Sequence, residues 1–229
     1  MDSATPGRII SERTMSRRDV EQCIANGRHR LVDCDLEEAD LTGLDFTCWT
    51  FERCSLRRAD FTRALLEETS WQSCRGAFAR FVGSDLAEAN FVASDFNNAV
   101  FKGARLPAAR FERSKLTGAD FSESGGLEVQ FEETLLIGAK LAGYSFKGMT
   151  LKRMDFSQAD LSRCDFREVV FDDCSLRDAL MAGARFAGAD LRGADLGGLR
   201  MSDASLFRGA TISRDQAGEL LGELGLKVR

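Results

Sequence analysis

The chain has 229 residues and a formal net charge of −5, from 31 Lys and Arg against 36 Asp and Glu, which argues against the basic surface that direct nucleic-acid binding needs. No stretch approaches the ~18 consecutive apolar residues that span a membrane, and residues 1–8 lack the apolar core of a signal peptide. We therefore expect a cytoplasmic protein that contacts neither a membrane nor nucleic acid directly.

Residues 1–30 are predicted to form an N-terminal tail followed by a short capping helix. Residues 1–15 are polar and irregular, so we expect this segment to be loose. Ser16 is a favourable N-cap residue, Asp19 follows it near the positive end of the helix, and Asn26–Gly27 supplies a stop signal. The helix is expected to cover the open end of the repeat array that follows.

Residues 31–210 repeat with a period of five. Stepping by five from Leu31 to Leu206 visits 36 positions, and 34 of them are Leu, Phe, Trp or Met; the exceptions are Gly76 and Gly126. Two residues before each central position lies a smaller residue, and 27 of these 35 positions are Ala, Cys, Ser or Thr. Neither the helical period of ~3.6 nor the strand period of 2 produces this pattern. A strict period over such a length predicts a solenoid.

The repeated phrase is a small residue, Asp and then Leu or Phe, as in Ala39–Leu41, Ala119–Phe121 and Cys164–Phe166. In this phrase the chain resembles the pentapeptide-repeat family. The resemblance implies an all-β solenoid, a right-handed quadrilateral β-helix in which four pentapeptides make one coil. The central and the small residue would then point inward, and the other three would face water. With 36 central positions, four to a coil, we expect about nine coils, closed by short N- and C-terminal capping helices.

Two places strain the repeat, at the central glycines Gly76 and Gly126. We expect a locally distorted coil at each, because glycine in a strand usually marks a bulge, although a binding spot is the alternative. Phe78 is expected to swing in and fill the space at Gly76, and Leu127 stands beside Gly126. Elsewhere the register is expected never to slip, so no large surface loop should occur.

Residues 211–229 are predicted to form a C-terminal helix and tail. Ser213 with Gln216 three residues on is a capping box, and Gly225 is a stop signal. Part of the apolar face of this helix should cover the last coil. The remainder is expected to join two copies of the chain into a homodimer through Leu220, Leu221, Leu224 and Leu226.

The residues needed for catalysis or metal binding are scarce. The chain has one histidine, His29, and no C-x-x-C motif, so we expect no catalytic, cofactor-binding or metal-ligating residues and no enzymatic activity. The aspartate before a central residue, as in Asp40 or Asp60, is expected to form a turn. Five of the seven cysteines fall in the small-residue position and are expected to be buried free thiols: Cys34, Cys54, Cys74, Cys164 and Cys174.

Sorting the outward positions by their place in the coil reveals an acidic stripe on the face that carries Phe46, Leu66 and Leu86. No base appears on this face before Arg105. The acidic stripe consists of Asp45, Glu67, Glu68, Asp85 and Glu88. Either it is a solvated surface or it binds a cationic partner.

Uninterrupted coils, a C-terminal helix and an acidic surface resemble the Qnr and MfpA branch of the family. That resemblance implies a dimeric DNA mimic that binds DNA gyrase or topoisomerase IV and protects it from quinolone-type poisons, an antibiotic-resistance function. The alternative is a structural or protein-interaction scaffold, or an effector, with an unrelated partner. In that case the irregular coils around Gly76, Gly126 and Tyr144 would form the contact surface.

Overall fold

The computed structural model describes residues 8–197, 205–222 and 225–228, and its contacts divide into two compact units, Met1–Phe131 and Glu132–Arg229. The first unit holds β1 (Arg8–Ser11), α1 (Arg17–Ile24), β2 (His29–Val32), β3 (Thr50–Glu52), β4 (Ser70–Gln72), β5 (Asn90–Val92) and β6 (Arg110–Glu112), with β7 (Gln130–Glu132) at its end. The second holds β8 (Thr150–Lys152), β9 (Val170–Asp172), β10 (Cys174–Ser175), β11 (Ala194–Asp195) and α2 (Arg214–Gly222).

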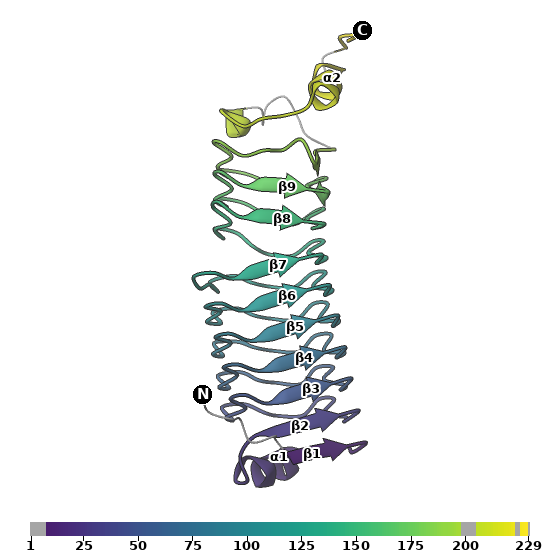
Figure 1. Ribbon diagram of the computed structural model, residues 1–229, viewed down its shortest axis with the longest axis vertical. Helices are drawn as coiled ribbons and strands as arrows, with labels where there is room; N and C mark the ends of the chain where they lie inside the picture. The colour runs from purple at the N-terminus through teal and green to yellow at the C-terminus, as the bar shows by residue number, and fades with distance from the viewer. Residues whose placement is uncertain (1–7, 198–204, 223–224, 229) are drawn as a thin grey trace, which may run out of the picture. The chain divides into compact units, whose positions relative to one another are not determined.

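Within each unit the chain winds as a parallel β-solenoid. Strands β1 to β7 form one sheet in sequence order, and Figure 1 shows them stacked coil upon coil. Phe51 pairs with Trp71, Trp71 with Phe91, and Phe91 with Phe111, so that each partner stands four pentapeptides further along the chain. In the second unit β8 and β9 pair with the same register. The predicted right-handed quadrilateral β-helix with four pentapeptides per coil is therefore confirmed.

The core consists of side chains stacked along the solenoid. The ring centroids of Phe91 and Phe111 lie 4.8 Å apart, and those of Phe111 and Phe131 lie 5.1 Å apart, with nearly parallel planes. Neighbouring columns meet edge to face, as Phe101 does with Phe111 at 5.7 Å. Each fully buried ring contributes roughly 1.5–3 kcal/mol to folding. The inward stacking predicted from the period of five is thus confirmed.

The aspartate before a central residue forms the turn at a corner of the coil, as predicted. Asp40 Oδ1 accepts a hydrogen bond of 3.0 Å from the backbone N–H of Thr42, and Asp60 Oδ1 accepts one of 2.9 Å from that of Thr62. The next residue turns the chain with a positive φ, as at Arg63, where φ is 58°. Local hydrogen bonding therefore closes each corner and leaves the outward side chains at fixed positions.

The N-terminal segment differs from the prediction. Arg8–Ser11 forms β1 and pairs in parallel with β2, with Ile10 opposite Leu31, and Met15 is buried. The expectation that residues 1–15 are loose is therefore wrong for residues 8–15, and residues 1–7 lie outside the described chain. The physical reason is that the first coil presents an unpaired strand edge, which β1 covers.

The predicted N-terminal helix is confirmed as α1. The Ser16 hydroxyl accepts a hydrogen bond from the Asp19 backbone N–H, and the Asp19 carboxylate accepts one from the Ser16 backbone, which makes a capping box. Val20 is fully buried on the inner side of the helix. Neither α1, α2 nor any other described helix has the length and apolar character to cross a bilayer.

At the two central glycines the structure corrects the expected fillers. Phe78 does not fill the space at Gly76, because its side chain is 48% exposed. The ring of Phe96 does so instead, since a Cβ atom placed on Gly76 would lie 2.1 Å from Phe96 Cε1. At Gly126 a Cβ atom would lie 2.3 Å from the backbone nitrogen of Pro107. A side chain therefore fills the space at Gly76, whereas backbone atoms of the preceding coil lie close to Gly126.

The register slips at the last coil of the array. In the regular coils the backbone N–H of a central residue donates to a carbonyl on the next coil. The acceptor is the residue immediately before the central residue at the same place in that coil, as Asp190 O is for the N–H of Phe171. The N–H of Leu191 donates instead to Thr211 O, one position beyond the regular acceptor. The expectation that the register never slips is therefore wrong for this coil. Helix α2 then begins with the predicted capping box between Ser213 and Gln216.

Candidate partner-binding surface

The acidic stripe lies along one side of the first unit. Asp45, Leu65, Asp85 and Arg105 occupy the same position on successive coils and form a ladder of parallel bridges, with steps of ~4.8 Å. One carboxylate oxygen of each aspartate accepts a hydrogen bond from the backbone N–H two residues on. Leu65 stands between the two aspartates and is 48% exposed, so the stripe includes an apolar side chain.

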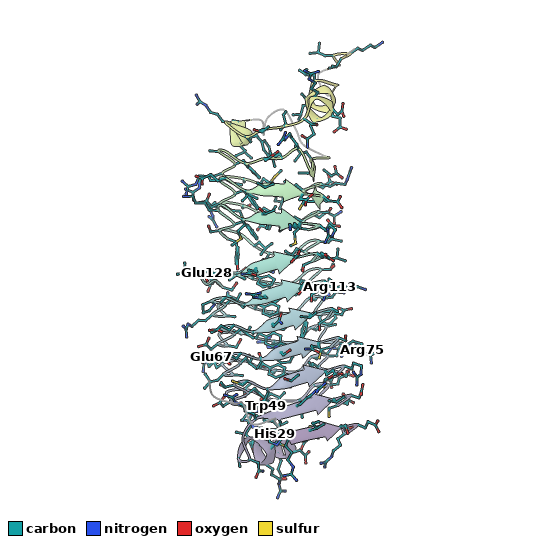
Figure 2. The ribbon with its side chains drawn as sticks, viewed as in Figure 1. His29, Trp49, Glu67, Arg75, Arg113 and Glu128 are labelled. Atoms are coloured by element: carbon teal, nitrogen blue, oxygen red, sulfur yellow. The ribbon has the colours of Figure 1, made fainter. Side chains whose placement is uncertain are left out.

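The three glutamates of the acidic stripe occupy the corner beside this ladder. Glu68 and Glu88 have the same corner position on adjacent coils, with φ values of 56° and 57°. The Cys48 thiol, one coil earlier, donates a hydrogen bond of 3.4 Å to Glu68 Oε2. In the described chain Glu67 and Glu88 form no ion pair. Figure 2 shows Glu67 on the side of the ribbon opposite Arg75.

The stripe ends where Arg105 forms an ion pair with Asp85, at 2.6 Å between Nη1 and Oδ2. Elsewhere in the unit an arginine at the same position of the next coil neutralises an acid in this way. The Arg53 guanidinium hydrogen-bonds Asp33 and holds the pKa of that carboxyl below its ordinary value. The further pairs of this kind near the start of the array are Glu37 with Arg57 and Glu38 with Arg58. Within the described residues Asp45, Glu67, Glu68 and Glu88 of the acidic stripe form no ion pair, and the three glutamates gather at one corner as an uncompensated cluster.

Two apolar side chains on this face were missed by the sequence analysis. Leu65 is half exposed and Leu127 is 84% exposed, and Leu127 precedes Glu128, which Figure 2 shows on the same side as Glu67. Their outward positions in the five-residue repeat were the available signal, because an apolar residue there has no place in the core. The face thus combines carboxylates with exposed leucines, a composition suited to a protein partner.

The C-terminal leucines expected at a dimer interface have different environments. Leu220 is partly buried, Leu221 is 37% exposed and Leu226 is 54% exposed, while Leu224 lies outside the described residues. Helix α2 is held to the last coil by Gln216, whose side-chain Nε2 donates hydrogen bonds of 2.7 Å to two backbone carbonyl oxygens. The hydrogen bonds that attach α2 to the last coil are therefore made by Gln216 and not by the leucine side chains.

The five cysteines of the small-residue position are buried and not in disulfides. Burial raises the pKa of Cys164 to about 12, and the hydrogen bond with Cys54, together with burial, raises the pKa of Cys74. Thiols with raised pKa values are unreactive at neutral pH. No group of three or more His, Cys, Asp or Glu side chains is arranged to hold a metal ion in the described part of the chain.

Three family models match the chain. They are described as a pentapeptide repeat region over residues 44–121 and as pentapeptide repeats over residues 136–180 and 170–206. No curated protein sequence matches.

Solved structures of QnrB1, a plasmid-mediated fluoroquinolone resistance protein, share the fold. The full-length structure has a TM-score of 0.55 at 18% identity, with 96% of this chain and 98% of that chain covered. A trypsin-treated QnrB1 variant has a TM-score of 0.53 at 20% identity, with 97% and 98% covered. HetL, a pentapeptide-repeat protein involved in heterocyst differentiation regulation in the cyanobacterium Nostoc sp., has a TM-score of 0.42 at 22% identity, with 81% and 86% covered. The chain belongs to the pentapeptide-repeat family.

Proposed function

We propose that the protein is a non-catalytic DNA mimic that binds a type II topoisomerase, DNA gyrase or topoisomerase IV, and protects it from quinolone-type poisons. The observation that carries the proposal is the cluster of Glu67, Glu68 and Glu88, which form no ion pair within the described residues, on the face where Asp85 pairs with Arg105. The likeness to QnrB1 over nearly the whole of both chains supports it, because the described role of that protein is fluoroquinolone resistance.

The solenoid suits the display of charge because its core is rigid. Stacked rings and a backbone ladder hold Glu68 and Glu88 on adjacent coils, one strand spacing of ~4.8 Å apart. Phosphates along one DNA strand follow each other at about 3.4 Å of helix rise. Carboxylates at a comparable spacing can occupy a cationic DNA-binding groove, and their long-range field accelerates encounter at low salt.

A non-catalytic role is consistent with how the interior is used. The inward positions are filled by stacked aromatic and aliphatic side chains such as Phe91, Phe101 and Phe111, which leaves the coil interior without room for a substrate. His29 is buried, and its Nδ1 is held by Gly27 O at 2.7 Å. The proposed activity therefore rests on the outer surface.

Supercoiling and drug-induced cleavage assays with purified gyrase test the proposal. The wild-type chain is compared with the triple variant Glu67→Lys, Glu68→Lys and Glu88→Lys. The matched control carries the same change of charge in the second unit, at Asp172→Lys, Asp173→Lys and Asp178→Lys. We expect wild type and control to protect gyrase from the drug, and the stripe variant to lose protection. Equal protection by all three, or none by wild type at micromolar protein, would contradict the proposal.

We also propose that two copies associate through the C-terminal helix. Leu221 and Leu226 expose apolar surface, and α2 is attached to its own chain by Gln216 rather than by these leucines. Sedimentation equilibrium of the wild-type chain should give twice the monomer mass. The variant Leu221→Glu with Leu226→Glu should give the monomer mass, and a wild-type monomer at 50 µM, roughly the range of weak dimers, would refute the association.

The second candidate function is a scaffold for an unrelated protein. Phe78 favours this candidate, because this aromatic residue lies at an outward position and is 48% exposed, and exposed apolar surface is typical of a protein-binding site. Phe78→Ser tests the two candidates against each other. A topoisomerase that binds the acidic stripe should be protected equally by this variant, whereas binding of a partner held by the coil that carries Gly76 and Phe78 should be lost.

A further inference from the structure

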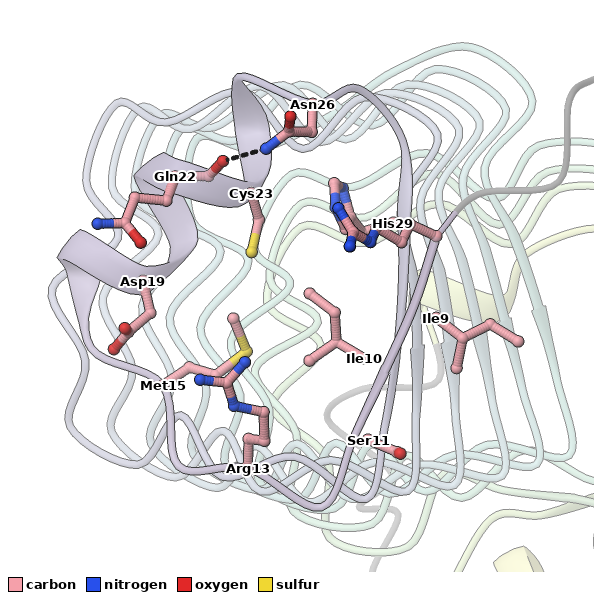
Figure 3. Close-up of a pocket in the computed structure, with 11 residues that line it drawn as sticks. Ile9, Ile10, Ser11, Arg13, Met15, Asp19, Gln22, Cys23, Asn26 and His29 are labelled. Atoms are coloured by element: carbon pink, nitrogen blue, oxygen red, sulfur yellow. Dashed lines mark hydrogen bonds between the residues drawn. The ribbon is translucent and has the colours of Figure 1, made fainter.

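A cavity of about 440 Å³ lies at the N-terminal end of the first unit, between β1 and α1 (Figure 3). Its volume falls in the range of small-molecule sites. The cavity lies outside the acidic stripe, so a ligand bound in it is independent of the proposed binding of a topoisomerase.

The inner part of the cavity is apolar. Figure 3 shows the side chains of Ile10, Met15 and Cys23 pointing into the space between the strand and the helix. Met15 is 3% exposed, whereas Ile10 and Cys23 are partly exposed. These side chains offer hydrocarbon and sulfur surface to a ligand of a few carbon atoms.

The same cavity is lined by two arginines, Arg8 and Arg13, and neither forms an ion pair within the described residues. Burial raises the pKa of the Cys23 thiol, while the positive charges of Arg13 and Arg8 act to lower it and the negative charge of Asp19 acts to raise it. The thiol stays protonated at neutral pH, so it does not neutralise the two arginines. Asp19 is the one carboxylate of the lining, and its Oδ2 already accepts hydrogen bonds from the Ser16 backbone and hydroxyl.

His29 adds a buried polar group to the lining. It is 2% exposed and its ring lies against Trp49, with 4.9 Å between ring centroids. Its Nδ1 makes a hydrogen bond of 2.7 Å with Gly27 O, which assigns the proton to that nitrogen because a carbonyl oxygen only accepts. Nε2 has no partner in the described chain and is left for a bound molecule. With the proton on Nδ1, Nε2 carries a lone pair and can only accept a hydrogen bond.

We propose that this cavity binds a small organic carboxylate with an apolar body. Arg8 and Arg13 pair with the carboxylate, as guanidinium groups do in anion sites. Ile10 and Met15 contact the hydrocarbon.

Alkylation of Cys23 by iodoacetamide in the full-length protein at alkaline pH, where the thiolate that reacts is populated, followed by peptide mass spectrometry, reports occupancy of the cavity. Hexanoate is the probe, and hexan-1-ol is its uncharged counterpart. Cys48 is the internal control, because it is the other partly exposed cysteine and lies outside the cavity. We expect hexanoate to slow the alkylation of Cys23 and leave that of Cys48 unchanged, while hexan-1-ol protects Cys23 only weakly.

Variants of the lining decide whether the cavity is the site. Arg8→Gln with Arg13→Gln should raise the hexanoate concentration for half-maximal protection by about tenfold or more. Arg63→Gln, which removes an arginine far from the cavity, should leave it unchanged. Ile10→Trp fills the cavity without removing charge and should abolish protection, with thermal melting confirming that each variant is folded. Equal protection of both cysteines, equal protection by the alcohol, or an unchanged midpoint in the arginine or tryptophan variant would overturn the proposal.

Discussion

The ring of Phe96 occupies the space that a side chain at Gly76 would need, with Cε1 2.1 Å from the position of a Cβ atom on that glycine. The two residues hold the same central position on adjacent coils. The bulk of one coil thus compensates for the missing side chain of the coil before it. The interior remains filled, and Phe96 is fully buried.

We predict that Gly76→Leu destabilises the protein, although leucine is common at central positions. The new side chain meets the Phe96 ring, and overpacking of this kind costs about 1–3 kcal/mol. Urea unfolding measures the loss. The double variant Gly76→Leu with Phe96→Leu should recover part of it, because the ring that blocks the leucine is gone. Additive losses in the double variant would contradict the assigned contact.

Two exposed glycines allow the conformation of the corner to be tested. Gly103 has a φ of +66°, Gly125 has no positive φ, and a Cβ atom on either would meet nothing within 4 Å. Gly103→Ala should lower the free energy of unfolding by about 1 kcal/mol, because alanine disfavours the left-handed conformation. Gly125→Ala should leave it unchanged or raise it slightly. Equal effects in thermal melts of the two variants would show that corner conformation does not matter.

We predict a loss of stability between about pH 4 and pH 2 that depends on Asp190. The Arg192 guanidinium donates hydrogen bonds of 2.9 and 2.6 Å to this carboxylate and lowers its pKa from 3.8 to about 2. Because the folded pKa lies below the unfolded one, the pair stabilises the fold above pH ~4, and this contribution disappears as the pH falls toward 2. Denaturant unfolding at a series of pH values measures the free energy of unfolding. Between about pH 4 and pH 2 this free energy should fall less steeply for Asp190→Asn than for Asp173→Asn. The same pH dependence of the free energy of unfolding in both variants would rule out the ion pair of Asp190 with Arg192 as a source of acid sensitivity.

Releasing Asp85 from Arg105 should strengthen binding to a cationic partner. Arg105→Gln removes the ion pair and adds one uncompensated carboxylate to the acidic stripe. If the stripe binds gyrase, half-maximal protection should need a few-fold less protein at low salt, with the gain screened above about 0.5 M salt. Arg63→Gln makes the same change of charge on another face and serves as the control. An equal gain for Arg63→Gln would mean that net charge alone is responsible.

Much of the coil was readable from the sequence because the period is strict. The one-coil step between Phe91 and Phe111, and the turn at Asp40, follow from residue types at fixed spacing. The filling of the space at Gly76 could not be predicted from the sequence. The pattern indicates which side chains point inward, but it does not indicate whether a ring packs against the coil before it or the coil after it. An acid and a base at the same position of successive coils, as Asp85 and Arg105 are, mark an ion pair that the sequence already contained.

The N-terminal cavity was beyond reach of the sequence for a different reason. It depends on β1, and this strand forms because the first coil offers an open edge to it rather than because Arg8–Ser11 follows the five-residue pattern. Edge pairing is a property of the folded neighbour.

The constant register of the ladder also bears on how such a chain can change in length. In the sheet of the first unit, Trp71 pairs with Phe51 on the strand before it and with Phe91 on the strand after it. A whole coil can therefore be removed or duplicated, and the new neighbours meet the same kind of surface as before. Losing a part of one pentapeptide would set corners against flat sides. Insertions and deletions in the gene are thus tolerated in whole coils, and growth by duplication adds fresh outward positions for mutation without reworking the interior.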